Sequence, residues 1–189
     1  MTSFHHPRLG QLTLDESLGW WETDIAVPLF GGQVLRLSFE PEEEDAPVSD
    51  ALFAAAEAML SLTPAALAEI TPHVWANYRE FRDAVGADDA LAIDPSADIW
   101  DFVQPGGVAV DMRDGDTYVS FECNCDWEIE HGLMLVLKAG MRWVKVSDYD
   151  GHVTDGHAYD KPLLDEWIKD PDAILPIRTF EQIQATPRE

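Results

Sequence analysis

The stretch from Thr117 to Trp127 constrains the fold of this chain more than any other, because its residues alternate between apolar and polar with hardly a break. The apolar positions are Val119, Phe121, Cys123, Cys125 and Trp127, and the polar positions are Ser120, Glu122, Asn124, Asp126 and, just beyond, Glu128. A period of two residues is typical of a β-strand with one buried face and one solvated face. The segment therefore predicts a strand in a sheet that is covered on one side.

Further strands are predicted before and after this segment. They cover residues 9–14, 20–27 and 33–39 in the N-terminal third, and residues 108–112, 133–138 and 141–147 in the last third. Gly31-Gly32 and Asp114-Gly115 are turn sequences that favour antiparallel hairpins.

Helices are predicted between the two sets of strands. Ser49 or Asp50 can cap one helix, and Thr63-Pro64 is a start signal for a second. Pro72 then either kinks the second helix or follows Thr71 as the cap of a third. Shorter helical segments are predicted at 97–102 and 162–168. The order predicts an α+β fold, a single domain over residues 1–189, with a largely antiparallel β-sheet and a central helical segment packed on it.

Acidity excludes several classes of partner. The chain has 36 Asp and Glu against 12 Lys and Arg, a formal net charge of −24, yet 46% of its residues are hydrophobic, too many for a disordered acidic tail. Binding to nucleic acid or to an anionic membrane requires clustered Lys and Arg, so neither is expected. A basic protein is the partner that this charge favours. Alternatively, the acidity reflects a genome-wide composition and serves solubility alone in a housekeeping protein.

The sequence favours a soluble cytoplasmic protein. Cys123 and Cys125 are separated by one residue, which would strain a disulfide. The first residues lack a basic region followed by an apolar core, and no apolar run approaches the roughly 20 residues that span a bilayer.

The residues richest in potential chemistry follow this strand. Trp127, Glu128, Glu130, His131 and His152 form the candidate functional cluster. On a regular strand Glu128 and Glu130 share one face and His131 lies on the other. A turn or bulge at the next residue, a glycine, would let all three converge as acid, base and histidine of a hydrolase. The simpler alternative is a set of charged residues on a solvated strand face.

Metal binding is a weaker alternative for the same region. Cys123, Cys125, His131, His152 and His157 are zinc ligand types, but cysteines one residue apart within a strand do not match the usual spacing of structural zinc sites. Core packing of both thiols is favoured, and we expect neither a metal nor another cofactor.

The run Cys125-Asp126-Trp127-Glu128-Ile129-Glu130-His131-Gly132 resembles the core of a group of uncharacterised bacterial domain families. Their shared pattern is Cys-x-Trp-Glu/Asp-x-Glu-His-Gly in a late β-hairpin, and the resemblance covers about residues 107–160. Some members are similar to immunity-type proteins of polymorphic toxin systems. The resemblance implies no catalytic residues.

Together these observations predict a non-enzymatic acidic domain that binds protein, similar to an immunity protein or antitoxin. Trp20 and Trp100 are candidates for its contact surface, because they lie outside the predicted apolar faces. The alternative is a metal-assisted hydrolase centred on Glu128, Glu130 and His131.

Overall fold

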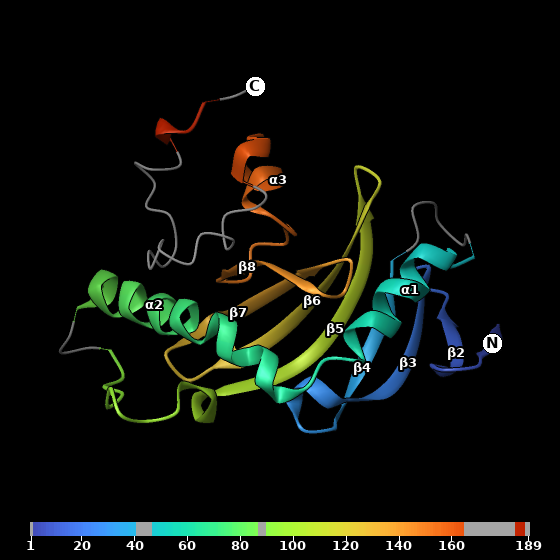
Figure 1. The fold of residues 1–189 in the computed structure, drawn as a ribbon, viewed down its shortest axis with the longest axis horizontal. Coiled ribbons are helices and arrows are strands. Elements are labelled where there is room, and N and C mark those ends of the chain that lie inside the picture. The colour runs from blue at the N-terminus through green and yellow to red at the C-terminus, as the bar shows by residue number, and fades with distance from the viewer. Residues whose placement is uncertain (1, 41–46, 87–89, 165–183, 188–189) are drawn as a thin grey trace. The chain divides into compact units, whose positions relative to one another are not determined.

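Eight strands form one sheet in the computed structural model, which describes residues 2–40, 47–86, 90–164 and 184–187 (Figure 1). The strands are β1 (Ser3–His6), β2 (Gly10–Asp15), β3 (Trp20–Val27), β4 (Gln33–Phe39), β5 (Val103–Arg113), β6 (Asp116–Cys125), β7 (Glu128–Lys138) and β8 (Arg142–Ser147). The α-helices are α1 (Asp50–Met59), α2 (Leu67–Val85) and α3 (Asp155–Tyr159), and the 3-10 helices are η1 (Pro28–Phe30), η2 (Pro64–Ala66), η3 (Ile99–Phe102) and η4 (Pro162–Leu164).

The order of the strands in the sheet follows their order in the chain. Strands β1 to β4 pair antiparallel, whereas β4 and β5 pair in parallel, with Leu37 opposite Val108. A parallel pair requires a long crossover, and the central helices provide it. The prediction of an α+β fold with a largely antiparallel sheet and a central helical segment is confirmed.

The chain divides into two compact units, and the first consists of Met1–Leu67, Pro105–Phe121 and Leu137–Arg142. Its helix α1 has Ser49, one of the two predicted caps, as its N-cap, and the Ser49 hydroxyl oxygen accepts a hydrogen bond from the backbone N–H of Leu52. The ring of Phe53 on this helix packs edge-on against Phe39, with centroids 5.3 Å apart. The helix thus covers the apolar face of the β3–β4 hairpin.

The second unit consists of Ala68–Gln104, Glu122–Val136 and Trp143–Glu189. Its main helix, α2, buries Ile70, Val74 and Tyr78 along one stripe. The helix continues through Pro72, so the alternative of a separate helix capped by Thr71 is wrong. The hydroxyl of Thr71 instead accepts a hydrogen bond from the indole N–H of Trp100, at 2.9 Å. The single-domain organisation stays a prediction.

Most predicted elements are present, but some differ from the prediction. Strand β1 and helix α3 were not predicted, and only the first turn of the predicted 162–168 helix, η4, lies within the described residues. Along β6 the predicted apolar positions are buried, but Ser120 is also buried instead of solvated, and so is Glu128 at the start of β7. Within the described ranges no single helix is long and apolar enough to cross a membrane; only α1 and Pro64–Val85 taken together, as a bent pair, reach that length and composition.

Candidate functional site

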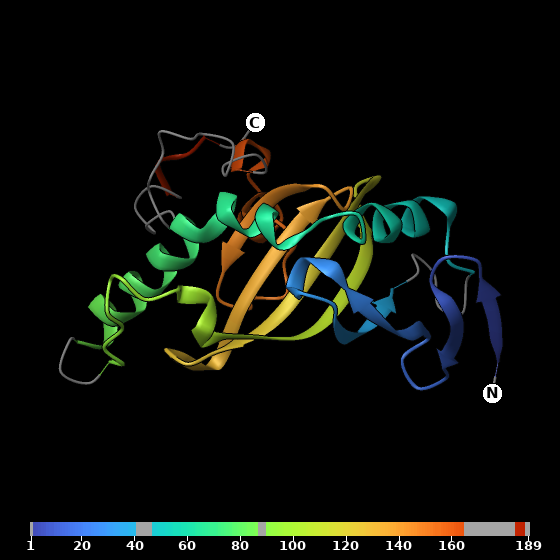
Figure 2. The same ribbon diagram turned by 60° about the horizontal axis from the view of Figure 1, so that its bottom comes forward.

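The β6–β7 hairpin carries most of the predicted functional cluster. Strand β6 ends at Cys125, Asp126 and Trp127 form the turn, and β7 begins at Glu128. The turn projects at the end of its two strands, gold in Figure 2. We call the segment Trp127–Gly132 the arch.

The side chain of Glu128 organises the arch. Its carboxylate accepts hydrogen bonds from three successive backbone N–H groups, those of Glu130 (2.9 Å), His131 (2.7 Å) and Gly132 (2.9 Å). In a regular strand successive N–H groups point to opposite edges, so the arch departs from the ladder, as a bulge does. Burial alone would raise the pKa of Glu128, but the three N–H groups and the nearby His131 outweigh it and the pKa is lowered. The carboxylate is therefore an ionised structural acceptor.

The structure brings together two of the three proposed hydrolytic residues. The Nδ1 atom of His131 lies 3.3 Å from a carboxylate oxygen of Glu128, and the imidazole is 63% exposed. Glu130 is exposed, and it reaches Glu128 through its backbone N–H. The predicted turn or bulge is present, but it directs the backbone of Glu130, not its carboxylate, toward Glu128.

Gly132 is required by the geometry of the arch. Its φ is +73°, in the region that favours glycine, and a Cβ atom there would overlap the carbonyl oxygen of Cys123. On the opposite side of the arch, the Cys125 thiol donates to the carbonyl oxygen of Glu128, at 3.3 Å. Burial raises the pKa of Cys125 to about 12, and burial also raises that of Cys123. Both thiols are inert, buried residues, which is the core-packing role expected for them.

Trp127 points inward and fastens the arch to helix α2. Its indole N–H donates to the side-chain oxygen of Asn77 at 2.8 Å, and the amide nitrogen of Asn77 donates to Asp148 at 2.8 Å. The Trp127 and Tyr78 rings meet edge-on with centroids 6.0 Å apart. Sequence reasoning missed Asn77, although a polar residue beside the Val74–Tyr78 stripe is a signal for such a buried polar link.

His152 belongs to a different network. Its backbone carbonyl accepts from the ammonium group of Lys145 at 2.8 Å, and its N–H donates to Asp150 at 2.9 Å. Lys145 is buried and also bonds both carboxylate oxygens of Asp150, at 2.7 and 2.6 Å. These contacts use the backbone of His152 to satisfy a buried lysine, which is a structural role.

The geometry gives the hydrolytic and metal alternatives little chemistry to use. In the described part of the chain no group of three or more His, Cys, Asp and Glu is placed to hold a metal ion. Both carboxylate oxygens of Glu128 already accept hydrogen bonds from backbone N–H groups. What the arch leaves open to a partner is the side chains of Ile129, Glu130 and His131, all of them exposed.

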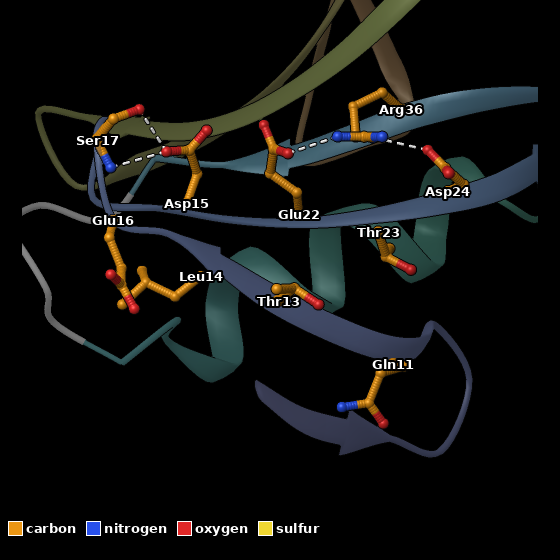
Figure 3. Close-up of a pocket in the computed structure, with 10 residues that line it drawn as sticks. All are labelled: Gln11, Thr13, Leu14, Asp15, Glu16, Ser17, Glu22, Thr23, Asp24 and Arg36. Carbon is orange, nitrogen blue, oxygen red and sulfur yellow. Dashed lines mark hydrogen bonds and ion pairs between the residues drawn. The ribbon is translucent and has the colours of Figure 1, made fainter. Parts of the chain in front are cut away.

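A second feature that sequence reasoning missed is an open groove of about 760 Å³ in the first unit (Figure 3). It is lined by strands β2, β3 and β4 and by the turn between β2 and β3, with the residues Gln11, Thr13, Leu14, Asp15, Glu16, Ser17, Glu22, Thr23, Asp24 and Arg36. The guanidinium of Arg36 lies between the carboxylates of Asp24 and Glu22, with both N–O distances 2.6 Å, and these bonds raise its pKa. The lining contains four carboxylates and one cation, so the groove is acidic.

Fold and site together define a mostly antiparallel α+β protein with a rigid, exposed hairpin end and buried, unreactive thiols. The chain belongs to the family described as "Domain of unknown function (DUF6985)", whose model matches residues 8–153. The match covers residues 107–153 of the region of sequence resemblance, including the arch and His152, and extends toward the N-terminus over β2–β4 and the central helices. No curated protein and no solved structure matches the chain significantly.

Proposed function

We propose that this protein is a non-catalytic binding domain whose partner is a basic protein, as for an immunity-type protein that covers its toxin. The observation that carries the proposal is the state of Glu128. The most plausible catalytic acid of the sequence is committed to three backbone N–H groups, while its neighbours point into solvent. This arrangement supports a structural role for Glu128, which holds the backbone of the exposed residues in place.

Charge supports the same conclusion. A net charge of −24 accelerates encounter with a basic protein and disfavours acidic competitors. The acidic groove of β2–β4 adds carboxylates to an open surface. The bacterial, cytoplasmic setting of immunity proteins is part of this proposal.

The test is a calorimetric titration of the purified protein with the protein encoded by the adjacent gene. We expect a complex at about 50 mM salt, whose dissociation constant rises about tenfold or more at about 500 mM, because salt screens exposed charges. The protein encoded by a distant gene and matched in size and isoelectric point serves as the control and should not bind. Absence of a complex at the lower salt concentration would contradict the proposal.

A further inference from the structure

The arch reverses the usual relation between residue type and burial. Glu128, a charged residue, is 5% exposed, whereas its neighbour Ile129 is 89% exposed. The next most exposed of the large hydrophobic side chains in the described ranges, Val34, is 64% exposed. Burial of an isoleucine is worth about 1.5–3 kcal/mol, so folding alone gives no reason for this arrangement. A local departure from the hydrophobic pattern that stability does not explain is typical of a functional position.

Hydrogen bonds fix the backbone on both sides of Ile129. Before it, the Cys125 thiol donates to the carbonyl of Glu128, and after it, three N–H groups donate to the Glu128 carboxylate. The adjoining Trp127 is held by Asn77. The exposed isoleucine is therefore displayed on an ordered backbone, and a partner that covers it loses little conformational entropy from this segment.

Several exposed residues close to Ile129 in the sequence are acidic. Glu130 is exposed on the arch, Asp126 is exposed in the turn, and Glu122 is exposed on the polar face of β6. The Asp126 carboxylate is positioned by a bond from the side chain of Gln104, at 3.1 Å. An exposed apolar side chain on a segment that also exposes carboxylates is complementary to an apolar socket with a basic rim.

We infer that Ile129 is the apolar anchor of the binding surface and inserts into an apolar socket, rimmed by Lys or Arg, on a basic protein partner. The inference rests on the proposed function and specifies the segment that makes the contact. Hot spots in interfaces are few and combine a buried apolar anchor with a polar rim. Ile129 supplies the anchor, and Glu130 and Asp126 supply the rim.

The experiment compares Ile129→Ser with the wild type in the same calorimetric titration with the adjacent-gene product. Val34→Ser is the matched control, since it also removes an exposed aliphatic side chain but lies on β4, in the first unit. We expect Ile129→Ser to raise the dissociation constant about 10- to 100-fold, the loss that corresponds to an unburied isoleucine. We expect Val34→Ser to bind like the wild type.

Salt dependence separates the anchor from the rim. Ile129→Ser changes no charge, so the slope of affinity against salt should match that of the wild type, whereas Glu130→Gln should make the slope shallower. Because the Ile129 side chain is exposed, its replacement should leave the melting temperature unchanged, which shows that the variant folds. Binding by Ile129→Ser within twofold of the wild type overturns the inference and leaves the proposed function standing. Failure of the wild type to bind overturns the proposed function and the inference with it.

Discussion

Replacement of Glu128 by alanine tests the structural role of the arch directly. The change removes the acceptor of three backbone N–H groups, of which the Gly132 N–H is buried and the other two are partly buried. A buried N–H without an acceptor costs about 2 kcal/mol, and each N–H that water can reach costs about 0.5 kcal/mol. We therefore expect Glu128→Ala to destabilise the arch by about 3 kcal/mol.

The measurement is hydrogen exchange at the backbone amides of Glu130, His131 and Gly132. If the arch opens locally, a loss of about 3 kcal/mol accelerates their exchange about 100-fold. The matched control is Glu130→Ala, which removes an exposed carboxylate from the same segment and should change stability by less than about 0.5 kcal/mol. If Glu128→Ala leaves the three exchange rates at their wild-type values, the carboxylate does not hold the arch and the reasoning is refuted.

The direction of the pKa shift of Glu128 determines how the stabilisation by this carboxylate depends on pH. The folded-state pKa of Glu128 lies below the ordinary value of 4.5, so its ionised form stabilises the folded protein above that pH. As the pH falls through the lowered pKa, this contribution is lost. The difference in stability between the wild type and Glu128→Gln should therefore be largest near neutral pH and should shrink in acid. A difference that stays constant down to pH values well below 4.5 would contradict the assignment.

Two further predictions concern packing and reactivity. Gly140→Ala should lower the free energy of unfolding by about 3 kcal/mol, because the residue has a φ of +69° and a new Cβ would overlap the carbonyl oxygen of Ala55. The control is Gly115→Ala, at a φ of +80° with open space around it, which should lower the free energy of unfolding by about 1 kcal/mol. Equal losses in urea titrations of the two variants would show that the contact with α1 is unimportant. Cys125, whose pKa burial raises to about 12, should react with a thiol reagent at pH 8 only after unfolding, and rapid labelling of the native protein would refute its burial.

The period-two pattern predicted the strands well because burial on one face of a sheet repeats regularly along the chain. Strand β1 escaped the prediction, since it is four residues long and includes His5 and His6, which carry no apolar alternation. Helix α3 escaped for a related reason, because its five residues include Gly156, a poor helix former. Short elements depend on tertiary contacts more than on local sequence.

The contacts made by the candidate site residues could not be predicted from the sequence. The sequence identified Trp127 to Gly132 as unusual, and the structure places them in one hairpin end. The sequence could not reveal that the Glu128 side chain turns inward. The periodicity of a strand describes the burial of apolar residues and takes no account of a carboxylate that accepts hydrogen bonds from backbone N–H groups. His152 was included for its imidazole, whereas the contacts in the structure involve its backbone.

Under the proposed function, the arch separates stability from recognition within a few consecutive residues. Trp127, Glu128 and Gly132 are specified by hydrogen bonding and by backbone conformation, and each would be expected even in a protein with no partner. Ile129 and Glu130 satisfy no need of the fold, since both are exposed. The residue types at these two positions can therefore change to suit a partner, whereas the residue types that hold the backbone cannot. Selection for binding should thus act on the exposed pair and leave the supporting three unchanged, so that one rigid frame can present different contacts to different basic proteins.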